Sequence, residues 1–262
     1  MIVTPWHNED QLEQFLAAWN ILDIPDYLIL QKDTDKEGCA RTKNKGIEKA
    51  LSLNPDIIVI LDDDCYPSEE AKTLEELLAK HRLALEPQPV ELFEAVTTPA
   101  SRGTPYYNRS IELPVAASMG FWLNVPDYDA VSQLTLSDRE IVFHRKVIYQ
   151  RYFPLSGMNL AFRPSWYPYC QFIDIPRFDD IWQGFIWQKK AYHDGYCFNL
   201  NGPLITHSRQ SNIWTNLKQE VKHLEENEQL WSLIHQHPSV AYKDLIALIP
   251  QNDMQNDMQN DM

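Results

Sequence analysis

The chain has 262 residues, of which 44% are hydrophobic, so it is long enough to bury the core of a single domain. Its formal net charge of −14 and sequence pI of about 4.9 argue against binding to the phosphate backbone of nucleic acid, which needs a basic face. No apolar run reaches the roughly 18–20 residues that span a bilayer, residues 1–5 do not have the pattern of a signal peptide, and four scattered cysteines lack metal-type spacing. We therefore expect a cytoplasmic protein with reduced thiols.

The first sixty residues alternate between short apolar strands and amphipathic helices. Strands are predicted at 2–5, 27–31 and 56–61, with one helix around 12–19 and a second over 38–51. This order is typical of a doubly wound, nucleotide-binding half. The chain has only 8 glycines and neither a Gly-x-Gly-x-x-Gly motif nor a P-loop, so a classical dinucleotide or P-loop site is not expected.

The third predicted strand runs directly into three aspartates, Asp62, Asp63 and Asp64. Its five consecutive apolar residues are typical of a buried central strand, and ligands of open α/β sheets bind beyond the carboxyl ends of such strands. Adjacent carboxylates raise one another's pKa unless a cation or strong donors hold them, and oxygen ligands suit Mg²⁺, Mn²⁺ or Ca²⁺. The motif predicts a metal site that clamps a diphosphate. The alternative is a solvated acidic turn before a helix.

The remaining elements are predicted in the following order. A helix capped by Ser68 carries His81 near the edge of the core, and short strands with proline-punctuated loops occupy 91–128. A strand, turn and strand fill 148–162, and a helix over 180–192, a strand over 196–205 and a charged helix over 216–236 follow. We predict one domain over 1–250, with a nucleotide-binding half (1–90) and a sugar or acceptor half (91–250). The repeated Gln-Asn-Asp-Met of residues 251–262 predicts a disordered tail.

Four motifs of the second half are distinctive: Gly120–Asp129, Ser156–Phe162, Arg177–Gly184 and Thr206–Asn212. Together with Ile60–Cys65, they resemble the reversibly glycosylated polypeptides, the UDP-arabinopyranose mutase family (glycosyltransferase family 75). The resemblance covers about residues 2–217 and implies an α/β, GT-A-like nucleotide-sugar-binding fold, with a central mixed, mostly parallel sheet and helices on both faces. It also implies a Mn²⁺ (or Mg²⁺) ion on the diphosphate of a UDP-sugar.

The resemblance assigns roles to residues at strand ends and helix starts. The implied metal ligands are Asp62, Asp64 and His207. The implied nucleotide contacts are Thr4, Pro5, Asp33, Arg41, Asp62 and Asp63, and the implied sugar contacts are Asn159 and Trp182. Asp179 and Asp180 open a helix and are expected to act on the sugar, although two carboxylates at a helix N-terminus are also stabilising by themselves. Two alternatives stay open: Arg41 is a surface arginine without a ligand contact, and His207 is a structural histidine and not a metal ligand.

Residues 102–109, Arg-Gly-Thr-Pro-Tyr-Tyr-Asn-Arg, match the family's self-glycosylation stretch. The resemblance implies that Arg102 is the glycosylated residue and that Arg109 is a second catalytic arginine. A guanidinium stays protonated at neutral pH and is a poor nucleophile, so the alternative is that both clamp the diphosphate.

The resemblance predicts an enzyme that interconverts UDP-L-arabinopyranose and UDP-L-arabinofuranose, with self-glycosylation on arginine. The alternative at the same site is a glycosyltransferase that passes a sugar from a UDP-sugar to a separate acceptor. A third reading is a UDP-sugar-binding or scaffold subunit without activity. The expected partner is a UDP-sugar, most simply UDP-arabinose; no membrane and no nucleic acid are expected, and a homo-oligomer is left open.

Overall fold

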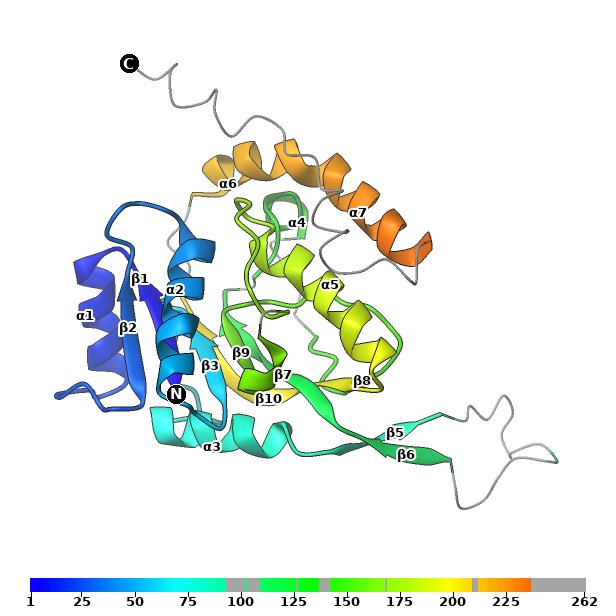
Figure 1. The fold of residues 1–262 in the computed structure, drawn as a ribbon. Coiled ribbons are helices and arrows are strands. Elements are labelled where there is room, and N and C mark those ends of the chain that lie inside the picture. The colour runs from blue at the N-terminus through cyan, green and yellow to red at the C-terminus, as the bar shows by residue number, and fades with distance from the viewer. Residues whose placement is uncertain are drawn as a thin grey trace.

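The computed structural model of the chain describes residues 1–92, 102, 109–125, 127–136, 142–167, 169–208 and 212–236. Its centre is one eight-stranded sheet (Figure 1). The strands are β1 (Ile2–Trp6), β2 (Leu28–Lys32), β3 (Ile58–Leu61), β4 (Cys65–Tyr66), β7 (Val115–Asn124), β8 (Val147–Ile148), β9 (Asn159–Phe162) and β10 (Cys197–His207). The spatial order is β2-β1-β3-β9-β7-β10-β4, with β8 paired to β10, so strands from both predicted halves share one sheet.

The sheet is mixed, as predicted. β1 pairs in parallel with β2 and β3, and β7 pairs in parallel with β10. β9 is antiparallel to both β3 and β7, while β4 and β8 are antiparallel to β10. The strands β1, β2, β3, β7 and β10 therefore run in one direction, and the other three run against them. This confirms the prediction of a mixed, mostly parallel sheet.

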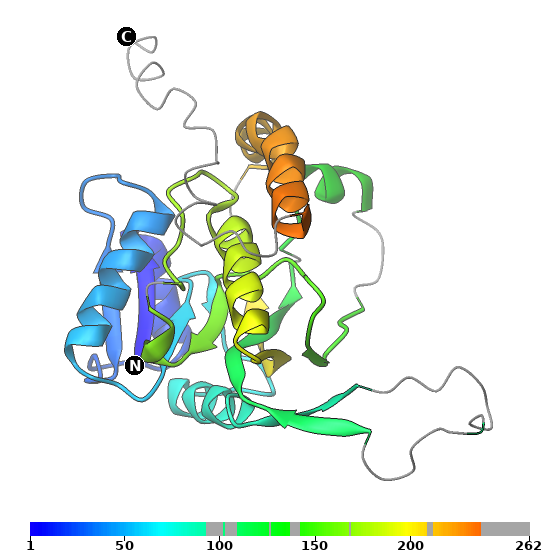
Figure 2. The same ribbon diagram turned by 45° about the vertical axis from the view of Figure 1, so that its right-hand side comes forward.

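Helices cover both faces of the sheet. The helices are α1 (Glu9–Ala18), α2 (Cys39–Ser52), α3 (Leu74–Ala84), α4 (Ala130–Leu136), α5 (Asp179–His193), α6 (Ile213–Glu220) and α7 (Leu224–Gln236). Apolar residues of α2 and α5 pack on one face, and those of α1 and α3 pack on the other. α7 lies over α5 (Figures 1 and 2). Within the residues described, no helix is both long and apolar enough to cross a membrane.

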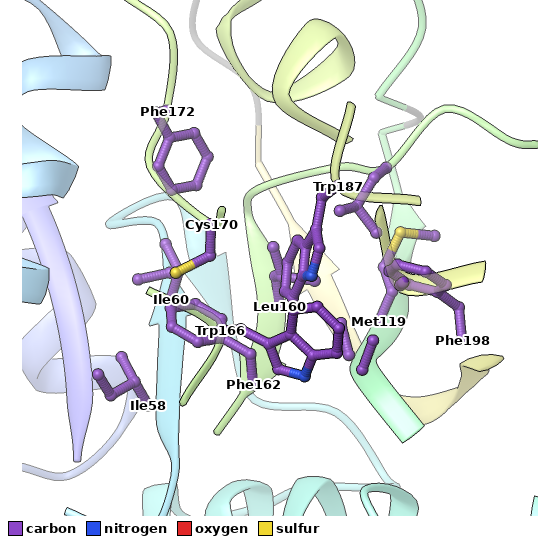
Figure 3. Packing of buried hydrophobic residues seen from close by; sticks show 14 of the residues in the cluster. Ile58, Ile60, Met119, Leu160, Phe162, Trp166, Cys170, Phe172, Trp187 and Phe198 are labelled. Atoms are coloured by element: carbon purple, nitrogen blue, oxygen red, sulfur yellow. The ribbon is translucent and has the colours of Figure 1, made fainter. Parts of the chain in front are cut away.

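The central strand β3 is apolar on both faces because each face is buried. Ile58 and Ile60 point into the cluster shared with α2 and α5, where Phe162, Trp166 and Trp187 fill the space (Figure 3). The alternate residues of β3 belong to the cluster under α1 and α3. This two-sided burial fixes the end of β3, and with it the aspartates that follow.

Two local predictions differ from the structure. Helix α3 begins at Leu74, and its N-cap is Thr73 rather than Ser68, because the Thr73 hydroxyl accepts from the Glu76 amide at 3.2 Å. Ser68 instead donates to the Leu204 carbonyl at 2.6 Å. The predicted helix over 216–236 is two helices, α6 and α7, joined by a 3₁₀ turn at Val221–His223.

A two-stranded ribbon of β5 (Gln88–Glu91) and β6 (Ser110–Leu113) projects from the body of the molecule in both views (Figures 1 and 2). β5 follows α3 and β6 leads into β7, so the end formed by Glu91 and Ser110 is the distal one. The predicted tail over 251–262 lies outside the described residues.

Candidate functional site

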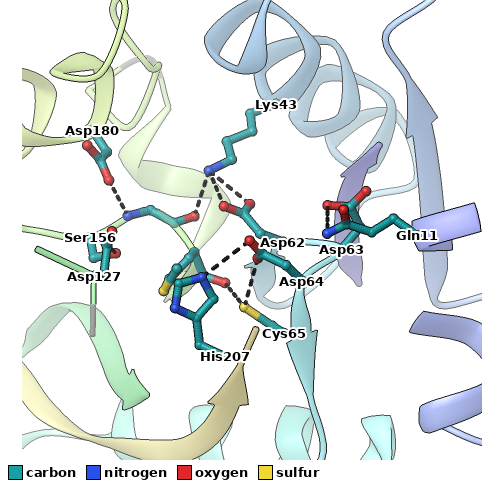
Figure 4. Close-up of polar contacts among 12 residues, drawn as sticks. Gln11, Lys43, Asp62, Asp63, Asp64, Cys65, Asp127, Ser156, Asp180 and His207 are labelled. Atoms are coloured by element: carbon teal, nitrogen blue, oxygen red, sulfur yellow. Dashed lines mark hydrogen bonds and ion pairs between the residues drawn. The ribbon is translucent and has the colours of Figure 1, made fainter. Parts of the chain in front are cut away.

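The three aspartates form a turn at the carboxyl end of β3, which we call the carboxylate turn. The Cys65 amide donates to the Asp62 carbonyl at 3.1 Å, and the Asp62 amide donates to the Met158 carbonyl at 3.1 Å. The segment that follows β3 is therefore a turn. Even so, Asp62 and Asp64 point to the side of Lys43 and His207, whereas Asp63 points toward Gln11 (Figure 4).

Asp62 is held by a buried lysine from α2. The Lys43 ammonium, only 3% exposed, lies 2.9 and 3.0 Å from the two carboxylate oxygens of Asp62. It also donates to the Gly157 carbonyl at 3.2 Å, and it lies 5.0 Å from the ring centroid of Phe172. Burial lowers the pKa of Lys43, but the carboxylate of Asp62 and its neighbours outweigh this and raise it, so the lysine is charged.

Asp64 faces a buried histidine from the end of β10. The His207 Nδ1–H donates to the Val125 carbonyl at 2.7 Å, and Nε2 lies 3.2 Å from an Asp64 carboxylate oxygen. Because the carbonyl accepts only, Nδ1 must carry a proton, and a neutral ring turns its Nε2 lone pair toward Asp64. A proton on Nε2 or a shared cation satisfies this arrangement. Burial works against the charged ring, but the Asp64 carboxylate raises the pKa of His207 overall.

Asp63 lies on the other side of the turn and is 9% exposed. One carboxylate oxygen accepts from the Gln11 amide at 3.4 Å, and the other has no hydrogen-bond partner among the described residues. Burial, together with the charges of Asp62 and Asp64, raises the pKa of Asp63 to about 7. A third carboxylate is thus buried without a cation of its own.

A second group of residues, which we call the α5 wall, lies across from the turn (Figure 4). It consists of three carboxylates and two residues that donate hydrogen bonds to them: Asp127, Asp179 and Asp180, with Ser156 and Gly157. The Gly157 amide donates to Asp180 at 2.8 Å, and the Ser156 hydroxyl donates to Asp127 at 2.9 Å. Burial and the nearby charges of Asp179 and Asp127 raise the pKa of Asp180 to about 8, and burial also raises that of Asp179. At neutral pH, Asp180 therefore holds a proton for most of the time.

The donor set fits a divalent cation at Asp64 and His207. A carboxylate oxygen and an imidazole nitrogen converge there, and the second ring nitrogen is fixed by a backbone carbonyl, as in many metal-ligating histidines. Mg²⁺-type ions usually take one or two carboxylates together with substrate phosphates. No group of three or more His, Cys, Asp or Glu side chains is arranged to hold a metal within the part of the chain that the structure describes. Asp64 and His207 are therefore suited to act as two protein ligands of such an ion, and the described residues do not form a site with three protein ligands.

The predicted nucleotide contacts lie around the ends of β1 and β2. Thr4 and Pro5 are buried in β1, and the Thr4 hydroxyl has no partner among the described residues. Both oxygens of Asp33 accept backbone amides, from Glu37 at 2.8 Å and Gly38 at 3.1 Å, so Asp33 orders the loop before α2. A contact between this group and a base stays a prediction.

Arg41 lies on the first turn of α2 and forms an ion pair. Its guanidinium contacts the Asp174 carboxylate at 2.5 and 2.6 Å, with the Arg41 side chain 53% exposed. This pair joins α2 to the loop before α5. In this structure Arg41 is therefore a surface arginine, which is the alternative that the sequence left open.

The two predicted sugar contacts are buried in this structure. Asn159 is fully buried: its amide donates to the Pro203 carbonyl at 2.8 Å, and its oxygen accepts from His81 at 2.8 Å. Trp182 is also fully buried, and its indole N–H donates to Asn227 at 2.9 Å. The polar groups of both side chains already have protein partners, which is the arrangement of core residues, and their contact with a sugar stays a prediction.

The predicted catalytic arginines lie in or next to the projecting ribbon. Arg109 directly precedes β6 at the distal end, where its carbonyl accepts from the Leu92 amide at 2.9 Å. The structure therefore places Arg109 away from the carboxylate turn (Figure 1). Arg102 is an exposed turn residue, and 93–101 and 103–108 around it lie outside the described residues. The roles of both arginines stay predictions.

Sequence reasoning missed two members of the site, Lys43 and Asp127. Lys43 shares the buried face of α2 with Ala40, Ile47 and Ala50, at helical spacing. A lysine on an otherwise apolar helix face is a signal by which this buried charge could have been predicted. Asp127 stood inside a quoted motif, but nothing local to it indicated the contact with Ser156, which is 29 residues away.

The comparisons with known proteins agree on one family. The family model described as "Reversibly glycosylated polypeptide" matches residues 51–239, which is more than half of the chain. The "Probable UDP-arabinopyranose mutase 1" of Pisum sativum is 33% identical over 183 residues, covering 63% of this chain and 50% of the relative. The "Probable UDP-arabinopyranose mutase 4" of Arabidopsis thaliana is 30% identical over 195 residues, covering 66% and 52%.

Among solved structures, residues 1–349 of S. aureus TarS in complex with UDP-GlcNAc match with a TM-score of 0.46 and 11% sequence identity. That match covers 82% of this chain and 60% of the TarS chain. The chain spans about half the length of the curated relatives that it matches. The matched region contains the carboxylate turn, the α5 wall and His207, but not Lys43 or the residues at β1 and β2.

Proposed function

Because this chain belongs to the reversibly glycosylated polypeptide family, we propose that it is a metal-assisted UDP-sugar enzyme that interconverts UDP-L-arabinopyranose and UDP-L-arabinofuranose. The names of the curated relatives, UDP-arabinopyranose mutases, support this choice of reaction and sugar. The mixed α/β sheet with its site beyond the end of β3 supports the GT-A-like, nucleotide-sugar-binding interpretation of the fold. A cytoplasmic location and an oligomeric assembly stay predictions.

The single observation that supports the proposal most is that two groups of carboxylates lie next to each other, joined by the Lys43 ammonium between Asp62 and Gly157. On one side, Asp64 and His207 converge, and we propose that they hold Mn²⁺ or Mg²⁺. When bound, that ion supplies positive charge to the diphosphate leaving group. On the other side, the α5 wall presents Asp180, which is protonated at neutral pH, and Asp127. The first group suits a diphosphate and the second suits sugar oxygens.

The proposed reaction needs a proton to be moved. The two UDP-sugars are isomers: C1 is joined to O5 in the pyranose ring and to O4 in the furanose ring. From the pyranose, the O4 hydroxyl loses its proton and O4 bonds to C1 as the C1–O bond to the β-phosphate breaks. A β-phosphate oxygen then bonds to C1 again as the C1–O5 bond breaks, and O5 gains a proton. A carboxyl whose pKa is about 8 can give and take that proton near neutral pH, which is the role we propose for Asp180.

Self-glycosylation on Arg102 is a separate part of the proposal. Arg102 is exposed, so its guanidinium is accessible to a sugar donor. Its match to the family stretch at 102–109 is what supports it. Because a guanidinium is a weak nucleophile, we propose it as a site of modification and do not route the isomerisation through it.

The test is incubation of the purified protein with UDP-L-arabinofuranose and Mn²⁺, followed by chromatography of the nucleotide sugars. We expect the pyranose form to appear, with Arg102→Ala retaining isomerisation but losing covalent incorporation of labelled sugar. Release of UDP without isomer would replace the mutase with a hydrolase, or with a transferase that lacks its acceptor. No turnover with either arabinose isomer would overturn the proposed substrate.

A further inference from the structure

The Lys43 ammonium contacts three oxygen atoms inside the site. It donates to one carboxylate oxygen of Asp62 at 3.0 Å and to the Gly157 carbonyl at 3.2 Å. The other oxygen of Asp62 lies 2.9 Å from the ammonium as an ion pair and has no hydrogen-bond partner among the described residues. The three residues come from α2, from the end of β3 and from the turn before β9, which are distant in sequence. The lysine therefore ties the carboxylate turn to the α5 wall (Figure 4).

Because Lys43 is buried, breaking its ion pair with Asp62 would cost much free energy. Lys43 is 3% exposed, and a buried ammonium that loses its partner is strongly unfavourable. Removing it from Asp62 would leave Lys43 with one carbonyl and the face of Phe172. A metal ion that took Asp62 as a ligand would have to displace the Lys43 ammonium from its carboxylate partner, and the remaining contacts of Lys43 among the described residues include no second hydrogen-bonded carboxylate.

Asp62 and Asp64 consequently differ in what they can offer a metal. Both oxygens of Asp62 already face an ammonium, whereas Asp64 faces a ring nitrogen that can itself be a ligand. A fixed positive charge next to Asp62 also repels a divalent cation there. Among the described residues, no three His, Cys, Asp or Glu side chains are arranged to hold a metal, although three aspartates are adjacent in sequence.

We propose that Lys43 is a built-in cation that withdraws Asp62 from metal coordination, so that Asp64 and His207 are the protein ligands of the metal. The inference deepens the proposed function and rests on it only in naming the ligands of that site. Lys43 is a positioning residue: it acts through Asp62 and Gly157.

The test measures Mn²⁺ binding by the substrate-free protein, using the electron paramagnetic resonance signal of free Mn²⁺. In Lys43→Met, Asp62 is released and joins Asp64 and His207, so we expect Mn²⁺ to bind at least about tenfold more tightly than in the wild type. Adding Asp62→Asn to this variant should abolish the gain. Lys43→Arg keeps the charge and should behave as the wild type. Lys45→Met is the matched control, because Lys45 lies two residues away on α2 but is 48% exposed.

A merely structural role for Lys43 predicts unchanged or weaker Mn²⁺ binding in Lys43→Met, and that result, or no binding in either protein, would overturn the inference. If circular dichroism shows that Lys43→Met is unfolded, Lys43→Gln replaces it, since Gln keeps a donor for the Gly157 carbonyl. The proposed function is scored separately by isomerisation in the wild type. A gain of Mn²⁺ affinity without wild-type turnover would leave the inference standing and overturn the function.

Discussion

The carboxylate turn and the α5 wall are built from the same residue type, but they neutralise it in different ways. At the turn, Asp62 faces the Lys43 ammonium and Asp64 faces the His207 ring. In the α5 wall, Asp180 accepts from a backbone amide and lies near other carboxylates. Asp62 and Asp64 are therefore balanced by positive charge or by a ligating nitrogen. Asp180, like Asp63 on the far side of the turn, is balanced by a proton.

The difference shows that the partners of an aspartate determine its chemistry more than its place in a motif does. Carboxylates paired with cations stay ionised and can organise a charged ligand, whereas crowded carboxylates become weak acids that exchange protons near neutral pH. One site can thus hold a diphosphate and move a proton with the same side chain type.

The largest effect is expected at the turn, from Asp64→Asn. The change removes the carboxylate charge that we propose for the metal, so turnover with UDP-arabinose should fall about 10³-fold. Mn²⁺ binding, measured by isothermal titration with UDP present, should be lost in parallel. Asp56→Asn is the control, because Asp56 precedes the opposite end of β3 and pairs with Arg82 at the surface. An Asp64→Asn enzyme within threefold of wild-type turnover would remove the metal role from this side chain.

The next effect concerns the α5 wall and separates its role from that of the turn. Asp180→Asn keeps the shape and an acceptor for the Gly157 amide but cannot release a proton, so kcat should fall about 10²-fold. Binding of UDP and Mn²⁺ should change by less than about twofold, because those ligands are assigned to the turn. Loss of UDP binding together with kcat would contradict the division of labour between the two groups.

A smaller effect is expected from Asn159→Ala, which lies beneath both groups. The change leaves the Pro203 carbonyl and the His81 N–H without their buried partner, so the free energy of unfolding should fall by about 2–3 kcal/mol. Chemical denaturation measures this, with Asn201→Ala, an exposed asparagine on β10, as the control. Substrate KM in the folded variant should stay within about twofold; a tenfold rise without a loss of stability would support Asn159 as a sugar contact.

The elements around β3 could be predicted because their signals are local. A strand that is apolar on both faces, followed by three aspartates, indicates a buried strand with a functional end, and the structure confirms the strand and its burial. The approach of His207 to Asp64 came only from the resemblance, since 143 residues separate them. No composition or spacing argument brings together two positions so far apart.

Burial inside a polar network was the feature that sequence could not show. Asn159 looked like a sugar ligand, because polar residues in a motif suggest function. In the structure its amide instead fills the space beside Gly120, where a Cβ atom would come within 2.2 Å of it. Lys43 was missed for the opposite reason, since lysines are expected at the surface and its partners lie on two other segments.

The finest test compares the two groups through the pH dependence of stability. The pKa of Asp180 is about 8 in the folded protein and near 4 when unfolded, so the folded state binds the extra proton between these values. The contribution of Asp180 to stability is therefore full below about pH 4 and is lost as the pH rises through about 8. Between pH 5 and pH 8 we expect the wild type to lose about 1–2 kcal/mol relative to Asp180→Asn, after allowing for its partial exposure.

Asp56 supplies the opposite sign for the same measurement. Its hydrogen bond from Arg82 lowers the pKa of Asp56, so its contribution is present above the unfolded pKa and is lost as the pH falls. Denaturant titrations of Asp180→Asn and Asp56→Asn from pH 3 to pH 9 should therefore diverge from the wild type at opposite ends of the range. If the Asp180→Asn difference is flat from pH 5 to pH 8, Asp180 is ionised at neutral pH like the carboxylate paired with Lys43. The two groups would then share one mode of charge balance, and Asp180 would act on the sugar as a base rather than as an acid.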